Sequence, residues 1–227
     1  MPKDNSRARL WTLAHAERAA LADDLATLTD DQWAHQTLCG RWTVEEVVAH
    51  LTAAASTGRF RWIASVLSAR FDFDKHNDRR LAESRGATPA ETLARFRSII
   101  PSTTAAWLGE VVVHAQDIRQ PLGLTTTPSV EAATDVARFF ATTNFTVPSK
   151  KSIEGLRLEA TDGPFATGTG PLVTGTTVAL VMVMAGRVSY CDDLGGAGVA
   201  TLRDRVAAAA ASAKTERASN LSAPPSD

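Results

Sequence analysis

The sequence predicts a chain of the class α plus α+β, with an antiparallel helical bundle followed by a small α+β domain. Two observations carry this prediction. Up to about residue 145, apolar residues recur at the spacing of amphipathic helices, and helix start signals precede several of these stripes. Beyond this point Gly and Thr become frequent, and apolar and polar residues alternate as in strands. We therefore expect domains over residues 1–147 and 148–213, with a disordered polar tail over 214–227.

Local motifs mark the first helices of the predicted bundle. Leucines recur on one face of residues 7–28, which predicts the first long helix. A capping box at 29–32 opens a short helical turn around Trp33. A second capping box, at 43–46, opens a helix that runs to about Ala54, and this helix carries a histidine at the edge of its apolar face.

Four further helices are predicted in the first domain. Helical spacing covers residues 59–71, and a Thr-Pro-Ala-Glu start at 88–91 opens a helix that Pro101 breaks. The next helix is expected over 102–120, before a Pro and a Gly that end it, and a last helix over 130–145. The long helices of this region predict the antiparallel bundle.

The second domain is predicted from shorter segments. An alternating strand at 155–161, a turn and two short strands come first, then a buried apolar helix and an Ala-rich final helix. Their expected ranges are 165–167 and 172–174 for the short strands, and 178–185 and 198–213 for the helices.

Composition narrows the classes of partner. Lys and Arg number 24 against 25 Asp and Glu, so the near-zero net charge disfavours a general nucleic-acid role. We expect a cytosolic protein, because the sequence shows neither a signal peptide nor an apolar run long enough to cross a membrane. Its two cysteines, Cys39 and Cys191, lie in no CxxC spacing and are expected to be small apolar fillers. If the protein handles thiols, the thiol comes from outside.

The strongest chemical signal lies in the helix predicted over 102–120. Glu110, His114 and Asp117 fall within roughly 60° of one helix face, at about 100° per residue. Apolar residues flank this stripe on both sides, which predicts that it points into protein. The flanking residues are Ala106, Trp107, Val111, Val113 and Ile118. Buried charges need compensation, and a divalent metal completed by a histidine from elsewhere supplies it.

His50 is the candidate for that further ligand. With Glu110 and His114 it offers Zn²⁺ two imidazoles and one carboxylate, which leaves a fourth vertex for water or for a substrate sulfur or oxygen. Such an open site is typical of catalytic rather than structural zinc. Glu46, one turn before His50, is better explained by the capping box. The alternative, a surface ion pair between Glu110 and His114, is disfavoured by the valines between them.

Asp117 and Arg187 have more than one interpretation. Asp117 could be a fourth ligand, a partner of Arg119, a cap of a neighbouring element, or an acceptor that orients a ligand imidazole, and we favour the acceptor. Arg187 follows the buried apolar helix. It either binds the last carbonyls of that helix or holds a substrate carboxylate bidentately.

Several of these segments carry a family likeness. The chain resembles the mycothiol-dependent maleylpyruvate isomerase family of actinobacteria, within the larger group of DinB-like metal-binding bundles. The likeness is carried by Leu38–Leu51 (LCGRWTVEEVVAHL), Glu110–Gly123 (EVVVHAQDIRQPLG), Leu158–Asp162, Ala185–Arg187 and Asp193–Gly198. Together they span nearly the whole chain apart from the tail.

The resemblance implies a DinB-like four-helix bundle followed by a sterol-carrier-like domain, with Zn²⁺ or another divalent metal held by His50, Glu110 and His114. It implies mycothiol as cosubstrate, its sulfur occupying the open metal vertex as a thiolate, and it favours Arg187 as an anion-binding catalytic residue. The expected function is cis-trans isomerisation of a maleylpyruvate-like electrophile or mycothiol S-transfer, by a monomer or homodimer. The alternatives are a metal-stabilised binding or regulatory module without turnover, and an ion-pair stripe without metal.

Overall fold

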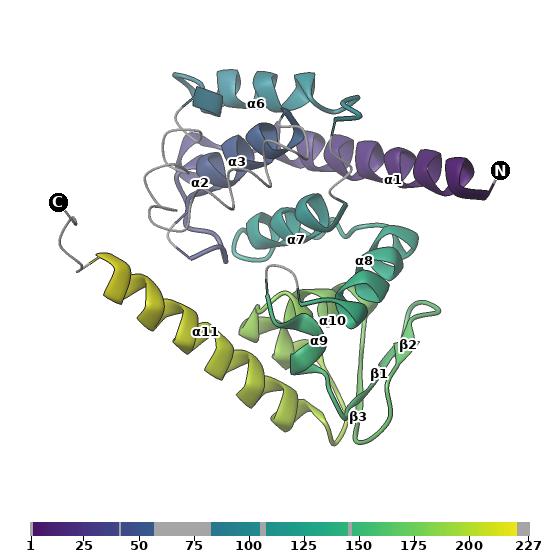
Figure 1. Cartoon of the computed structure of the whole chain (residues 1–227). Coiled ribbons are helices and arrows are strands. Elements are labelled where there is room, and N and C mark those ends of the chain that lie inside the picture. The colour runs from purple at the N-terminus through teal and green to yellow at the C-terminus, as the bar shows by residue number, and fades with distance from the viewer. Residues whose placement is uncertain (1, 41, 57–82, 105–107, 145–146, 222–227) are drawn as a thin grey trace, which may run out of the picture. The chain divides into compact units, whose positions relative to one another are not determined.

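Helices form most of this protein (Figure 1). The structure is a computed structural model that describes residues 2–40, 42–56, 83–104, 108–144 and 147–221. Its contacts divide the chain into two compact units, Met1–Pro128 and Ser129–Asp227. Among the described residues, the one sheet has three strands and lies in the second unit. The predicted class, α plus α+β, is confirmed.

Four helices of the first unit pack around an apolar core. They are α1 (Pro2–Leu25), α3 (Val44–Ser56), α6 (Pro89–Ser98) and α7 (Leu108–Arg119), and α6 and α7 each contact both α1 and α3. Leu21, Val47, Phe96 and Ile118 are wholly buried in this core. The antiparallel four-helix bundle stays a prediction, because the helix expected at 59–71 lies outside the described residues.

Side-chain caps start the helices of the first unit where the sequence predicts them. Before α2 (Asp30–Trp33), Thr29 and Gln32 form a reciprocal capping box. Before α3, Thr43 Oγ1 accepts a hydrogen bond from the Glu46 amide, and Glu46 Oε2 accepts one from the Thr43 amide at 2.8 Å. Thr88 caps α6 in the same way through one bond. The capping box therefore accounts for the Glu46 carboxylate.

The motif helix α7 is described from Leu108, and residues 102–104, at its predicted start, are not helical. The chain after α6 instead turns, and distant side chains hold it there: Arg18 Nη1 donates to Ser102 O at 3.0 Å, and His15 Nε2 lies 3.2 Å from the same oxygen. Both side chains come from α1, so the local sequence gave no sign of this turn. Residues 105–107, which include two of the residues predicted to flank the ionisable stripe, lie outside the described residues.

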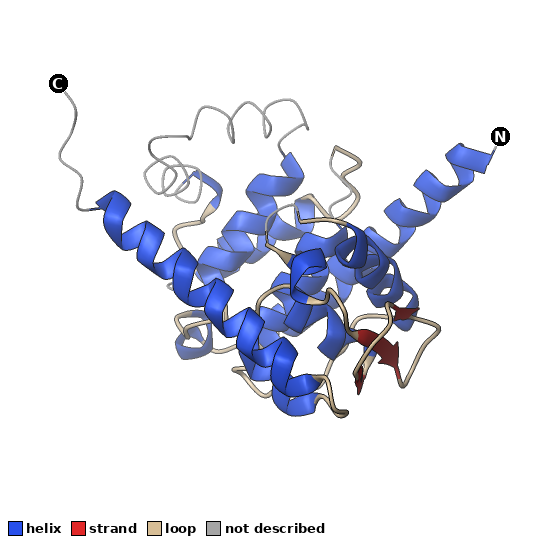
Figure 2. Ribbon diagram, turned by 60° about the horizontal axis from the view of Figure 1, so that its bottom comes forward, coloured by secondary structure: helices blue, strands red, loops and turns tan. Residues whose placement is uncertain are grey.

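The second unit combines helices with the small sheet (Figure 2). Its elements are α8 (Val130–Thr142), α9 (Ser149–Ser152), β1 (Arg157–Ala160), β2 (Ala166–Thr167), β3 (Leu172–Gly175), α10 (Thr177–Met184), the 3-10 helix η1 (Val188–Asp193) and α11 (Val199–Leu221). The strand order is β2-β1-β3, with β1 antiparallel to β2 and parallel to β3. The contacts group α8 with this unit, although the sequence places it before the boundary predicted after residue 147.

Two helices of the second unit follow from composition. The apolar run predicted as a buried helix forms α10, in which seven of the eight residues are buried. The Ala-rich helix α11 extends to Leu221, beyond its predicted end at residue 213, because no Gly or Pro interrupts the chain before Pro224. Across the described parts of the chain, we find no helix with both the length and the apolar character needed to cross a bilayer.

Candidate metal centre

Helix α7 carries its ionisable residues into the interior of the first unit. The exposed fraction of the side chain falls along the stripe, from 30% for Glu110 to 11% for His114 and 0% for Asp117. The three valines between Glu110 and His114 are buried as well. The stripe thus leads from a half-exposed carboxylate to a fully buried one. Ala106 and Trp107, predicted to flank it, lie outside the described residues.

His50 of α3 meets this stripe. Its Nε2 lies 3.2 Å from Glu110 Oε2, and His114 Nε2 lies 3.3 Å from the same oxygen. The two imidazole rings are 5.1 Å apart between centroids and nearly perpendicular. The structure therefore brings together the three residues that the sequence nominates as metal ligands, with one donor atom of each within 4.8 Å of the others.

Two groups of the centre, Glu110 and His114, have strongly shifted pKa values. Burial by itself raises the pKa of Glu110, but hydrogen bonds and charge interactions with His114 and His50 outweigh burial and hold this pKa well below its usual range. Burial lowers the pKa of His114, yet hydrogen bonds with Asp117, Cys39 and Glu110 raise it well above its usual value. By themselves, these side chains therefore favour an anionic Glu110 beside a protonated His114.

Asp117 faces the other nitrogen of His114. Its Oδ2 lies 2.9 Å from His114 Nδ1, so the carboxylate accepts a hydrogen bond from Nδ1–H, and Nε2 faces Glu110. The sequence left open a pairing of Asp117 with Arg119. In the structure, Arg119 Nε donates instead to Asp24 Oδ2 at 2.7 Å. The geometry suits the orienting role expected for Asp117.

The loop between α2 and α3 adds two residues that sequence reasoning missed. Cys39, expected as an apolar filler, forms a second cluster of potential ligand atoms with His114 and Asp117. Trp42 lies against His50, with ring centroids 5.0 Å apart. Both residues belong to the LCGRW segment quoted for its family likeness. The sequence signal for these two residues is their position just before the capping box of the helix that carries His50.

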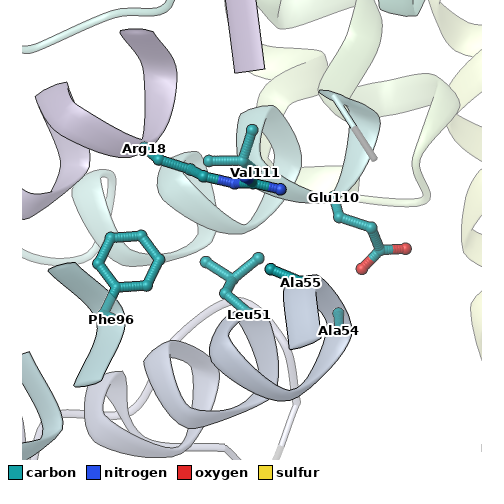
Figure 3. Close-up of a pocket in the computed structure, with 7 residues that line it drawn as sticks. All are labelled: Arg18, Leu51, Ala54, Ala55, Phe96, Glu110 and Val111. Carbon is teal, nitrogen blue, oxygen red and sulfur yellow. The ribbon is translucent and has the colours of Figure 1, made fainter. Parts of the chain in front are cut away.

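A small pocket reaches the candidate centre from the core side (Figure 3). Phe96 lies at one end of the residues drawn and the Glu110 carboxylate at the other, with Leu51 between them. The pocket is lined by Arg18, Leu51, Ala54, Ala55, Phe96, Glu110 and Val111. Burial lowers the pKa of Arg18, whose guanidinium donates to carbonyls that follow α6. Glu110 thus lies between its two histidines and a largely apolar wall.

Arg187 belongs to the second unit. Its Nη1 donates to Ala185 O at 2.6 Å, directly after α10, and its backbone amide donates to Met182 O. This is the helix-end contact that the sequence allows for it. The anion-binding role expected from the family likeness stays a prediction.

The donor set fits a tetrahedral metal ion. Bonds of 2.0–2.1 Å to zinc place any two ligand atoms of a tetrahedron about 3.3 Å apart. Glu110 Oε2 lies 3.2 and 3.3 Å from the two histidine nitrogens, so both measured edges match this expectation. Two imidazoles and one carboxylate are also the ligand types that zinc prefers at catalytic sites.

Comparisons with known proteins concern the family and the fold. The family model described as the mycothiol maleylpyruvate isomerase N-terminal domain matches residues 14–109. Two solved structures, a crystal structure of the mycothiol-dependent maleylpyruvate isomerase and one of a mutant of it, share the fold with TM-scores of 0.50 and 0.52. Identity is 13% and 14%, over 84% of this chain and 92% of each of theirs. No curated protein matches the chain. Over residues 14–109 the chain therefore matches the mycothiol maleylpyruvate isomerase family, the same family that its sequence motifs resemble.

Proposed function

We propose that this chain is a divalent-metal-dependent enzyme that uses mycothiol as a thiol cosubstrate and isomerises the cis double bond of a maleylpyruvate-like substrate. One observation carries the proposal: His50, Glu110 and His114 converge, with both histidine nitrogens at 3.2–3.3 Å from Glu110 Oε2 and all three donor atoms within 4.8 Å of one another. The family match and the shared fold favour the thiol and the isomerase class.

Each residue of the centre has a task in this proposal. His50, Glu110 and His114 hold the metal, and Asp117 keeps the Nδ1 proton of His114 in place so that Nε2 faces the ion. When bound, a divalent metal supplies a positive charge that stabilises the thiolate form of the cosubstrate, which is the nucleophilic form. Glu110 contributes the one negative charge of the ligand set.

The chemistry needs no further reactant. The mycothiol thiolate adds to one carbon of the activated double bond, and the electron pair moves to the adjoining carbonyl as an enolate. The former double bond is now single and rotates. Collapse of the enolate expels the thiolate and restores the double bond in the trans form, so the thiol is returned unchanged.

Mycothiol S-transfer is the second candidate, because it shares the first step. If the enolate is protonated and the thioether is released, one thiol is consumed for each substrate. Isomerisation instead uses the thiol catalytically. Counting free thiol against converted substrate therefore separates the two reactions.

The remaining elements of the proposal concern scaffold and substrate. We place the metal in an antiparallel four-helix bundle and assign the substrate carboxylate to Arg187, whose guanidinium suits bidentate binding of such a group. A cytosolic location, and zinc as the native metal, belong to the same proposal. The family likeness and the ligand types support them.

Metal analysis tests the proposal first. We expect about one divalent metal ion for each purified chain, and its loss in His114→Ala. Full retention of the metal in that variant contradicts the site. Cobalt substitution then asks whether mycothiol reaches the metal: a changed absorption spectrum supports the enzyme, whereas an unchanged spectrum and no turnover with mycothiol favour a binding module.

A further inference from the structure

The loop that joins α2 to α3 brings a side chain to each of the two candidate histidine ligands. Trp42 lies against the ring of His50 at a tilt of 39°. Cys39 lies beside His114, with its sulfur within 4.8 Å of donor atoms of His114 and Asp117. Neither Trp42 nor Cys39 is among the metal ligands proposed above. Two residues of the loop 37–42 therefore lie beside the two imidazoles, one beside each ring.

One threonine closes this loop on itself. Thr37 is 8% exposed, and its Oγ1 donates to Trp42 O at 2.8 Å while accepting a hydrogen bond from the Cys39 amide at 3.1 Å. The Thr37 amide donates to the same Trp42 oxygen at 3.0 Å. Two bonds from Thr37 therefore fix Trp42, and a third fixes Cys39.

The loop is also attached to the motif helix. The Leu38 amide donates to Asp117 O at 3.1 Å, which joins the loop to the residue that orients His114. Gly40 has φ +71°, a left-handed conformation that a residue with a Cβ adopts at a cost of about 1 kcal/mol or more. These bonds hold residues 37–40 and Trp42 beside the helices that carry the two histidines.

We infer that the loop 37–42 is a positioning device for the metal centre, with Trp42 fixing the ring of His50 and Cys39 fixing the ring of His114. A metal ion binds two imidazoles only when the nitrogen lone pairs of both rings point at the ion. Neighbouring groups that fix the orientation of the rings therefore affect metal affinity. The inference rests on the metal centre of the proposed function. It adds three residues, Thr37, Cys39 and Trp42, that are not among the proposed ligands.

Thr37 offers the sharpest test, because it contacts neither histidine. Thr37→Val removes the hydroxyl at nearly constant volume, and Thr37→Ser keeps it. In competition of the full chain with a chromophoric chelator for Zn²⁺, we expect the Val variant to bind roughly 10-fold more weakly and the Ser variant to match the wild type. Equal affinity in all three proteins overturns the inference.

A matched pair of tryptophans tests the ring contact. Trp11 lies against His15 in the same unit, with centroids 5.9 Å apart, and neither residue belongs to the metal cluster. We expect Trp42→Leu to weaken Zn²⁺ binding roughly 10- to 100-fold, Trp42→Phe to weaken it less, and Trp11→Leu to leave it unchanged. Unfolding of the metal-free variants is measured alongside. If both leucine variants lose affinity only in proportion to lost stability, the positioning role is wrong.

Cobalt spectra decide the role of Cys39. Cys39→Ala should shift the ligand-field bands of the Co²⁺ protein, while Cys191→Ala, at a cysteine in the second unit, should leave them unchanged. If the wild type instead shows an intense sulfur-to-cobalt charge-transfer band that Cys39→Ala abolishes, Cys39 is a ligand and the inference is wrong for it. A wild type that binds neither Zn²⁺ nor Co²⁺ contradicts the proposed function itself. A wild type that binds metal beside unaffected loop variants contradicts only this inference.

Discussion

Helices α7 and α10 are both buried along most of their length, yet they are buried for different reasons. In α10 the buried side chains are almost all aliphatic or thioether groups, so burial needs no compensation beyond packing. In α7 the buried set includes His114, Gln116, Asp117 and Arg119. A helix keeps such groups in its interior only when each finds a partner. The composition of the buried faces therefore marks α10 as core and α7 as the carrier of the candidate site.

The partners of α7 come from three other segments. His50 arrives from α3, Cys39 from the loop before it, and Asp24 from α1, where it pairs with Arg119. In α10 the polar contact lies at the N-terminus, where Thr177 donates hydrogen bonds to Asp162 Oδ1 from both its amide and its hydroxyl. The difference between the helices is therefore one of chemistry rather than of exposure.

The largest effect is expected from removing a ligand on α7. His114→Ala takes away one of three ligands and leaves the Glu110 charge with one histidine. We expect metal affinity to fall by a factor of roughly 1,000 or more, about 4 kcal/mol. Chelator competition measures this loss. Affinity within a factor of ten of the wild type would place the metal elsewhere.

A truncation in α10 should lower stability but leave metal affinity unchanged. Met182 is wholly buried, so Met182→Ala should lower the free energy of unfolding by about 2–5 kcal/mol through lost packing and the cavity left behind. Metal affinity at 25 °C should not change. Denaturant unfolding and metal titration of the same sample measure the two quantities. A loss of metal in this variant would mean that the two helices are not distinct in their roles.

A smaller effect is expected at Asp117, which touches a ligand rather than the metal. Asp117→Asn keeps the size of the side chain but removes its charge. We expect metal affinity to fall roughly 10- to 100-fold, with Glu110→Gln as the stronger reference variant. If Asp117→Asn binds metal as tightly as the wild type, the carboxylate serves only the fold.

Arg187 should affect substrate rather than metal. If it binds a carboxylate, Arg187→Gln should raise KM for an anionic substrate by roughly 10- to 100-fold, because a charged hydrogen-bonded contact contributes about 1.5–3 kcal/mol. Metal content should stay at the wild-type level. A lower thermal stability with unchanged KM would instead show that Arg187 serves the end of α10 through its bond to Ala185 O.

Features set by neighbouring residues could be predicted from the sequence. The capping boxes at Thr29 and Thr43 form because the four residues of each box bond to one another. The spacing of Glu110 and His114 likewise fixes their shared helix face. That His50 is their companion followed from its place on a second apolar helix face, although no local rule brings two helices together.

Features set by distant contacts could not be predicted. The non-helical chain at residues 102–104 depends on Arg18 and His15 of α1, which hold the turn at Ser102. The roles of Cys39 and Trp42 depend on how a loop lies against two helices, and a loop carries no periodicity that predicts its contacts. The parallel pairing of β1 with β3 is similar, because their shared register becomes visible only when the strands are side by side.

The smallest effect, and the one that separates α7 from α10 without mutation, is the pH dependence of the metal-free protein. The raised pKa of His114 means that its contribution to stability is complete below about pH 6.5, its unfolded value, and is lost as the pH rises through the folded pKa. The lowered pKa of Glu110 acts at the other end, since its contribution is present above about pH 4.5 and is lost as the pH falls further. Helix α10 has no titrating side chain and contributes to neither limb.

We therefore expect the chelator-treated protein to melt at lower temperature as the pH rises above about 6.5, by roughly 2–4 °C for each 1 kcal/mol lost. His114→Gln should flatten this alkaline limb. Metal should remove it too, because a bound ion takes the place of the proton and holds the imidazole neutral at these pH values. Differential scanning calorimetry with and without Zn²⁺ measures both effects. An alkaline limb that persists unchanged in His114→Gln would mean that another group is responsible, and the electrostatic distinction between the two helices would not hold.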